Sequence, residues 1–218
     1  MLLIVLLLCQ VNEFKEKPYR VLFIGNSYTY MNQMPELFRG RATAAGFNVK
    51  VDWVTSGGMT LSQHASSSKT QQKLSQGFDF VVLQEQSLMP LQDLEKTLDS
   101  VQTLAKEIRR KGGEPLLMMT WGRQKGWGPF SDFKGMNEKL IERYQHLAKK
   151  LNLRVIPVAQ VWQFLVERDP NIELWQTDGS HPSRIGSEFI ADILVKFVFE
   201  PELFSVEQMS EFILETTP

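Results

Sequence analysis

The sequence is poor in the residues that build disulfides and metal centres. Its 218 residues include one cysteine, Cys9, and three histidines, His64, His146 and His181. A lone cysteine excludes an intrachain disulfide. The histidines lie far apart and no Cys or His-Glu motif accompanies them, so we expect no metal site; the chemistry inferred below also needs no cofactor. We expect His146 on a helix surface, and His64 as well, although His64 follows Gly58 closely enough to line a pocket instead.

The chain also lacks an excess of charge of either sign. It has 24 basic and 25 acidic side chains, for a formal net charge of -1, and no basic stripe runs along the sequence. A nucleic acid is therefore not an expected partner. The length suits one domain, which we place at residues 18–218 with a helical tail, and no internal repeat or low-complexity linker divides it.

Long apolar runs are missing too, except near the start. Residues 2–8 are continuously apolar and are followed by Cys9 and a polar stretch, with no basic residue before Lys15. This run is too short to span a bilayer, so no stable membrane span is expected. Two interpretations of residues 1–17 stay open. A secretory or lipoprotein signal would make the protein secreted, periplasmic or lipid-anchored, whereas an apolar leader or a misplaced start would leave it in the cytoplasm.

What the chain does have is an alternation of short β-rich runs with longer helical ones, typical of βα units. The runs at 78–83 and 115–120 are apolar nearly throughout, as expected for strands covered on both faces. The sequence thus predicts an α/β fold, a three-layer α/β/α sandwich with a five-stranded, mostly parallel sheet. The expected strands are residues 20–24, 48–54, 78–83, 115–120 and 154–158, and the expected helices are 34–45, 61–69, 91–111, 134–151, 161–167, 185–199 and 205–217.

Small and polar residues follow the first three predicted strands. Ser27 follows the first, Gly57 and Gly58 the second, and Gln84-Glu85-Gln86-Ser87 the third. In an open parallel sheet these positions gather at one edge, where sites form. Each also has an ordinary explanation: a capped β-to-α turn, a flexible turn and solvated glutamines. Their joint placement favours a site.

A histidine with an acidic neighbour lies near the other end of the chain, in Thr177-Asp178-Gly179-Ser180-His181-Pro182. A serine hydroxyl is a poor nucleophile at neutral pH unless an imidazole takes its proton, and a carboxylate fixes the tautomer of that imidazole. Ser27, His181 and Asp178 therefore supply a candidate nucleophile, base and orienting acid. In isolation, the segment is equally good turn chemistry with Ser183 as a helix cap.

Together these segments resemble the SGNH hydrolases, also called the GDSL esterase and lipase family. Gly25-Asn26-Ser27-Tyr28-Thr29 resembles the first block of that family, which implies that Ser27 is the nucleophile and that its backbone amide is an oxyanion donor. Gly58 resembles the glycine of the second block, which implies a second backbone donor. Asp178 and His181 match the Asp-x-x-His of the last block. The resemblance extends from Ile24 to Pro182 and implies a flavodoxin-like α/β/α fold.

The third block departs from the family pattern. The family commonly has Gly-x-Asn-Asp where this chain has Gln84-Glu85-Gln86-Ser87. Gln86 would replace the asparagine donor, because a glutamine carries the same amide on a longer stem, and Gln84 is a possible substitute for it. Glu85 has no assigned role. Asn26, where the family usually has aspartate, is expected to brace the turn.

The resemblance implies hydrolysis of short-chain carboxylic esters, with a small-molecule ester or an acylated carbohydrate as the partner. Trp121, Trp127, Phe130 and Trp175 lie near the expected site. Flat aromatic faces suit a sugar ring, which points to a carbohydrate O-acetyl ester, unless these aromatics close the core or form a lid. No extended apolar lid is evident, so a short acyl group is expected.

Two other functions fit parts of the sequence. A flavodoxin-like ligand-binding domain would use Asn26, Ser27 and Thr29 to cradle a phosphate and tryptophans to flank a flavin. It would leave Asp178 and His181 without a role. A catalytically degenerate hydrolase that only binds glycans is compatible with the altered third block.

Overall fold

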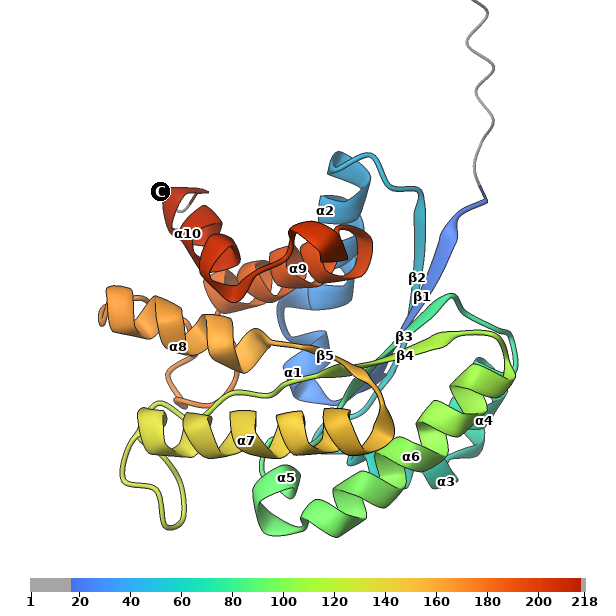
Figure 1. Cartoon of the computed structure of the whole chain (residues 1–218), viewed down its shortest axis with the longest axis horizontal. Coiled ribbons are helices and arrows are strands. Elements are labelled where there is room, and N and C mark those ends of the chain that lie inside the picture. The colour runs from blue at the N-terminus through green and yellow to red at the C-terminus, as the bar shows by residue number, and fades with distance from the viewer. Residues whose placement is uncertain (1–16, 217–218) are drawn as a thin grey trace, which may run out of the picture.

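The computed structural model describes residues 17–216 of the chain (Figure 1). The apolar run at residues 2–8 and Cys9 lie outside this range, and so do the two interpretations that depend on them. Among the described helices, none combines the length and the apolar composition that crossing a membrane requires.

Five strands form one sheet in the order β2-β1-β3-β4-β5. Every neighbouring pair is parallel, which confirms the predicted sheet. The strands are β1 Tyr19–Gly25, β2 Val49–Thr55, β3 Phe80–Gln84, β4 Glu114–Met118 and β5 Arg154–Ile156. Because all five run in the same direction, the loops that follow them collect at one edge of the sheet.

The helices alternate with these strands. They are α1 Ser27–Tyr30, α2 Met34–Ala44, α3 Leu61–Ser66, α4 Ser68–Leu74, α5 Met89–Gln92, α6 Leu94–Arg110, α7 Phe133–Leu151, α8 Val158–Arg168, α9 Arg184–Phe199 and α10 Val206–Thr216, with 3-10 turns η1 Met31–Gln33 and η2 Pro201–Leu203. The expected C-terminal helix is α10, which packs on the core through the buried Met209 and Ile213.

Three predicted boundaries are wrong, each at a residue that suits a helix start. The predicted helix 91–111 is broken at Asp93, whose side chain accepts a hydrogen bond from the Lys96 amide and caps α6. The predicted helix 61–69 ends at Ser66, because the Ser67 hydroxyl caps α4. Pro157 ends the last strand early, so α8 begins at residue 158 and not at 161. At Asp93 and Ser67, local capping thus outweighed helical periodicity, whereas Pro157 makes no side-chain cap.

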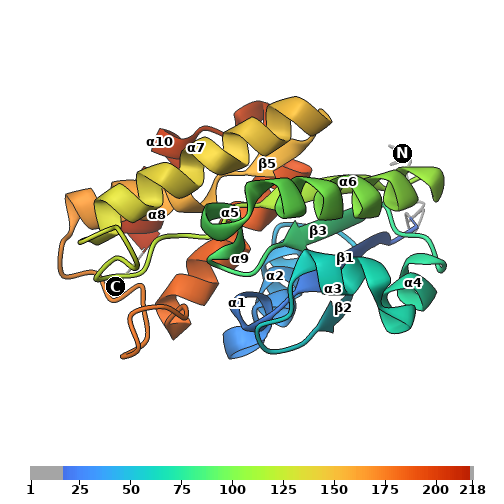
Figure 2. The ribbon, with the colours of Figure 1, turned by 90° about the horizontal axis from the view of Figure 1, so that it is seen from below.

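Helices cover both faces of the sheet, which gives three layers (Figures 1 and 2). In β1, Val21 and Phe23 belong to one hydrophobic cluster, whereas Leu22 and Ile24 belong to the other. This is the period of two that a strand imposes. The first cluster is covered by α2, α8, α9 and α10, and the second by α3, α4, α6 and α7. A strand buried on both faces has to be apolar throughout.

Candidate active site

Three side chains from opposite ends of the chain form one hydrogen-bonded series. His181 Nε2 lies 2.9 Å from Ser27 Oγ, across a sequence separation of 154 residues. His181 Nδ1 lies 2.5 Å from Asp178 Oδ2. An ionised carboxylate can only accept, so Nδ1 carries the proton and Nε2 is left to accept the serine hydroxyl. The structure thus brings together the three side chains that the sequence singled out.

Asp178 organises the loop that carries the histidine. Its Oδ1 accepts hydrogen bonds from the backbone amides of Ser180 and His181, at 2.9 and 3.0 Å. Partial burial acts to raise the pKa of Asp178, but the hydrogen bonds from the His181 side chain and from these amides outweigh it and hold the pKa below its usual value. The carboxylate is therefore ionised at neutral pH, as an orienting acid requires.

The serine lies in a tight turn directly after β1. Asn26 Oδ1 accepts from the Tyr28 amide at 3.1 Å, and Asn26 Nδ2 donates to the Met59 carbonyl at 3.1 Å. Asn26 therefore braces the turn, as expected, and ties it to the loop after β2. Ser27 is partly exposed, whereas its neighbours Asn26 and Tyr28 are buried. Only the nucleophile of this turn faces outward.

Gln84 supports the same turn from the core side. Its Oε1 accepts from the Asn26 amide at 2.9 Å and from Thr29 Oγ1 at 2.8 Å, while its Nε2 donates to the Glu85 carbonyl. The side chain is fully buried. A Cβ at Gly25 would lie 2.5 Å from both Gln84 Oε1 and Thr29 Oγ1, so this position requires glycine. Because its amide is fully buried and hydrogen-bonded through both its oxygen and its nitrogen, Gln84 is not exposed as an oxyanion donor.

His64 is fully buried, and the expectation of a helix-surface position was wrong. Its Nε2 lies 2.9 Å from the Gly25 carbonyl and its Nδ1 lies 3.0 Å from Thr70 Oγ1. Leu61 and His64 lie one turn apart on the inner face of α3, a spacing that could have indicated burial. Burial lowers the pKa of His64, against the opposing effect of its hydrogen bond to Gly25. By contrast, His146 is exposed, as expected.

The expected oxyanion donors are the backbone amides of Ser27 and Gly58 and the side chain of Gln86. The backbone amides of Ser27 and Gly58 donate no hydrogen bond within residues 17–216. Gly58 has a φ of 66°, which favours glycine. Gln86 Oε1 accepts from the Leu88 amide at 2.8 Å, but Gln86 Nε2 has only a long 3.5 Å contact to Ser87 Oγ. Its amide protons are therefore largely available to a ligand.

Glu85 has a role that the sequence did not reveal. Its Oε1 accepts from the amides of Leu61 and Gln86, at 2.9 and 2.7 Å. The side chain is buried, and burial raises its pKa despite these hydrogen bonds. Glu85 thus joins the start of α3 to the loop that carries Gln86.

Two of the aromatics expected to form a sugar platform are buried. Trp121 is stacked between Tyr28 and Trp162, with centroid distances of 4.7 and 4.3 Å, and has no exposed surface. Trp175 is 9% exposed. The indole nitrogens of Trp121 and Trp175 donate to the carbonyls of Ser180 and Gly122. The platform expectation was therefore wrong for these two residues, and the alternative that they close the core is confirmed.

Trp127 and Phe130 are partly buried and pack against the second hydrophobic cluster.

The phosphate-binding alternative also loses its donors. Asn26 and Thr29 are buried, and their side chains already donate to Met59 and Gln84. Neither is free to cradle a phosphate.

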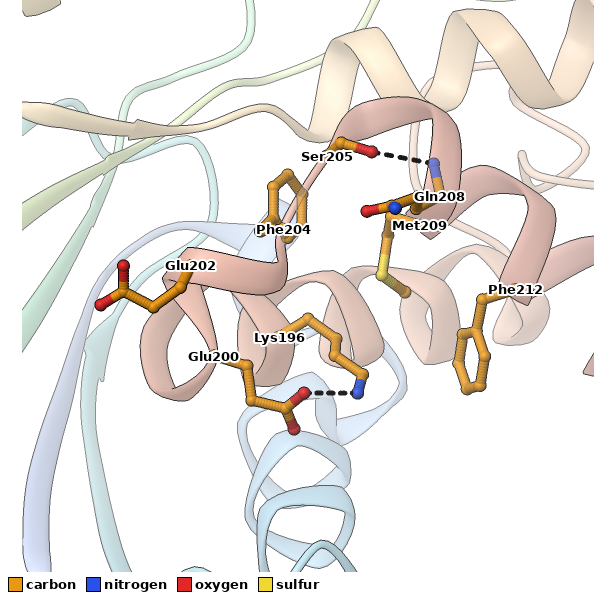
Figure 3. Close-up of a pocket in the computed structure, with 8 residues that line it drawn as sticks. All are labelled: Lys196, Glu200, Glu202, Phe204, Ser205, Gln208, Met209 and Phe212. Carbon is orange, nitrogen blue, oxygen red and sulfur yellow. Dashed lines mark hydrogen bonds and ion pairs between the residues drawn. The ribbon is translucent and has the colours of Figure 1, made fainter.

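A cavity of about 410 Å³ lies elsewhere, between α9 and the segment that carries η2 and α10 (Figure 3). Lys196 and Glu200 form an ion pair of 2.6 Å at this cavity. None of its lining residues belongs to the series of Ser27, His181 and Asp178. In the described part of the chain, no three His, Cys, Asp or Glu side chains are grouped as metal ligands.

Comparison with known proteins gives a consistent result at the level of structure. No protein-family model matches the chain, and no curated protein sequence matches it. A structure from Slackia heliotrinireducens, assigned to the SGNH hydrolases, is 26% identical with a TM-score of 0.71 and covers 83% of this chain and 98% of its own. The acetyl xylan esterase AlAXEase is 16% identical, with a TM-score of 0.69 and coverage of 83% and 100%. The lipase/acylhydrolase from Enterococcus faecalis is 19% identical, with a TM-score of 0.66 and coverage of 83% and 95%.

Proposed function

We propose that this chain, which belongs to the SGNH hydrolase superfamily by its fold and structural neighbours, is a serine esterase whose nucleophile is Ser27. The observation that carries the proposal is the hydrogen-bonded series from Ser27 Oγ through the His181 ring to Asp178, with distances of 2.9 and 2.5 Å. Such a series makes a serine hydroxyl nucleophilic at neutral pH. The partial exposure of Ser27 and His181 leaves both within reach of a substrate.

The mechanism follows from the roles of these groups. His181 Nε2 takes the proton of Ser27 as Oγ attacks the ester carbonyl, and Asp178 stabilises the imidazolium that forms. The backbone amides of Ser27 and Gly58, with Gln86 Nε2, hold the oxyanion. The tetrahedral intermediate expels the alcohol, which takes the proton from His181. Water then attacks the acyl-enzyme by the same route, so that the acid leaves and Ser27 is regenerated.

The proposed substrate is a short-chain ester, in particular an acetyl ester of a carbohydrate. The rim beside Ser27 supports this proposal, because the loop residues Ser56, Gly57 and Gly58 are exposed and polar or small. Gln124 and Asp178 are exposed on the other side. A rim of this kind suits a polar alcohol better than a long acyl chain. Acetyl xylan esterase, named for one structural neighbour, is an activity of this class.

The decisive experiment is labelling with a fluorophosphonate probe, followed by mapping of the labelled peptide. We expect one label, on Ser27, and none in Ser27→Ala. An unlabelled wild-type protein would contradict the esterase proposal. A rise in melting temperature with acetylated sugars would then favour the glycan-binding alternative, and a yellow purified protein would favour the flavin-binding one.

The substrate class needs a separate measurement. Nitrophenyl esters from acetate to octanoate should be hydrolysed with kcat/KM falling as the chain lengthens, and acetylated oligosaccharides should release acetate. A preference for octanoate would refute the carbohydrate ester and leave the serine esterase intact.

A further inference from the structure

Two consecutive residues after α1 have an unusual backbone. Asn32 has φ 53° and ψ 22°, and Gln33 has φ 57° and ψ 39°, both in the left-handed region although neither is glycine. Such a residue is strained and persists only where the surrounding structure fixes it. Asparagine tolerates this region better than most residues, and glutamine does not share that tolerance. The pair therefore marks a place where other contacts determine the path of the chain.

The contacts of Asn32 explain its conformation. Its Nδ2 lies 3.0 Å from the Pro182 carbonyl, 2.9 Å from the Ser183 carbonyl and 2.9 Å from Ser187 Oγ. The two carbonyls come directly after His181, and Ser187 lies in the first turn of α9. Since the amide has two protons for three acceptors, at least one proton is shared. Gln33, by contrast, is exposed and its side chain caps nothing.

These hydrogen bonds connect the two halves of the candidate site. Asn32 lies five residues after Ser27, on the short segment formed by α1 and η1. Two of its three acceptors, the carbonyls of Pro182 and Ser183, come directly after His181. On the other side of His181, the Tyr28 hydroxyl lies 2.6 Å from Ser180 Oγ. Residues close to Ser27 in sequence therefore hydrogen-bond to the residues on both sides of His181.

We infer that Asn32 is a positioning residue, which sets the separation of Ser27 Oγ and His181 Nε2 by holding the backbone that follows the histidine. This inference rests on the proposed esterase function. The left-handed backbone aims the Asn32 side chain at the loop. Only a donor fits there, because all three neighbouring atoms can accept and the two carbonyls can do nothing else. We call the hydrogen bonds from Asn32 Nδ2 to this loop the clamp. Misplacement of a catalytic group by 1 Å costs about a hundredfold in rate, so loss of the clamp should lower kcat measurably.

The test compares Asn32→Gly with Gln33→Gly. Both substitutions put glycine at a left-handed position and relieve the same strain, but only the first removes the clamp. We expect Asn32→Gly to lower kcat for nitrophenyl acetate at least about tenfold, with KM within about twofold of wild type. Gln33→Gly should leave both constants within about twofold. Equal kcat in the two variants would overturn the inference.

A loss of folded protein has to be distinguished from a loss of alignment. The final extent of fluorophosphonate labelling counts intact sites, while the labelling rate per site reports how well Ser27 and His181 are aligned. We expect full labelling of Asn32→Gly at a reduced rate. Reduced labelling at the wild-type rate per site would mean that Asn32 serves stability alone, and would overturn the positioning role.

Two further variants test the chemistry of the clamp. Asn32→Asp keeps the shape but replaces the donor with an acceptor that repels the two carbonyls, so it should lower the labelling rate at least as much as Asn32→Gly. Ser187→Ala leaves both carbonyl acceptors in place and should stay within about twofold of wild type. A wild-type rate in Asn32→Asp would contradict the need for a donor.

Failure of the esterase proposal gives a different result. In that case the wild type itself takes no label, and crystal structures of the two glycine variants become the readout. The separation of Ser27 Oγ and His181 Nε2 should exceed hydrogen-bonding distance in Asn32→Gly and stay near the 2.9 Å of the wild type in Gln33→Gly. An unchanged separation in both would overturn the inference.

Discussion

The serine and the histidine of the candidate site are held in different ways. The nucleophile turn, residues 25–29, is fixed from inside: Gln84 and His64 are fully buried and hydrogen-bond to its backbone. The histidine loop, residues 178–183, lies nearer the surface, and Asp178 keeps 47% of its side chain exposed. Its hydrogen bonds come from Asn32, Tyr28 and Trp121, from Gln124, and from the preceding residues 174–176.

This difference implies that the nucleophile turn is the more rigid part of the site and that the histidine loop is the more adjustable one. A turn fixed by buried polar groups can open only at the cost of unpaired donors and acceptors in the core. A loop held at the surface opens at a lower free energy. The serine is thus the more fixed partner, and the histidine is the one whose alignment depends on contacts made nearer the surface.

The largest effect should come from removing either partner. Ser27→Ala and His181→Ala should each lower turnover of nitrophenyl acetate by at least about a thousandfold, because either loss abolishes proton transfer from the nucleophile. Melting temperatures should stay close to that of the wild type, since both side chains are partly exposed. Retention of activity in either variant would contradict the assignment.

Breaking the support of the nucleophile turn should cost stability first. Gln84→Leu leaves the Asn26 amide and the Thr29 hydroxyl without their acceptor, at about 1–3 kcal/mol for each buried group. Urea unfolding should show the loss. Gln86→Leu, two residues further along the chain and less buried, is the matched control and should destabilise by less. A similar loss of unfolding free energy in both variants would contradict a special role of Gln84 in supporting the nucleophile turn.

Acid should weaken the same turn through His64. Burial holds the folded-state pKa of His64 below the value of 6.5 that applies to the unfolded chain. As the pH falls through that value, the unfolded chain binds a proton first, so stability present at neutral pH is lost at up to about 1.4 kcal/mol per pH unit. In His64→Gln the free energy of unfolding should depend less steeply on pH between about 7 and 5. Equal slopes would exclude His64 as the source.

The smallest expected effect lies on the loop side. Tyr28→Phe removes the hydroxyl that hydrogen-bonds to Ser180 Oγ and to the Ser87 side chain, and keeps the ring stacked on Trp121. A net hydrogen bond contributes about 0.5–1.5 kcal/mol, so the melting temperature should fall slightly and kcat by a few-fold. Ser180→Ala should reproduce part of the effect, and the loss in the double variant should be smaller than the sum of the two single losses. Additive losses would show that the two hydroxyls act independently.

The sequence predicted the sheet well because the central strands are buried on both faces and therefore apolar, as in β1. It also predicted the joint placement of Ser27, Asp178 and His181, because a serine directly after the first strand and a late Asp-x-x-His segment match two blocks of the family pattern. Only Ser27 follows a strand, since Asp178 and His181 lie between α8 and α9. What it missed depends on tertiary packing. The burial of His64 and Trp121 follows from which face of α3 meets the sheet and from the stacking of Trp121 on Trp162. The one local signal was the spacing of three between Leu61 and His64, which places both side chains on the same face of α3.

The support given by Gln84 and Asn32 was missed for the same reason. Each acts across more than fifty residues of sequence, through an amide that is polar and unremarkable in its own segment. The break at Asp93 was missed because its cap competes with an otherwise continuous helical periodicity. The pattern that defines the reacting groups was visible, while the scaffold behind them was not.

The stack of Tyr28, Trp121 and Trp162 makes the intrinsic fluorescence of the protein a means to follow the candidate site. Tyr28 lies edge-on to His181, with ring centroids 5.4 Å apart, and stacks on Trp121, which stacks in turn on Trp162. A change in the position of the His181 ring should therefore alter the surroundings of the two buried indoles. The ultraviolet emission of Trp121 and Trp162 should shift when a covalent inhibitor reacts with Ser27 Oγ, which lies beside the His181 ring. Occupancy could be followed in real time, with no dye attached.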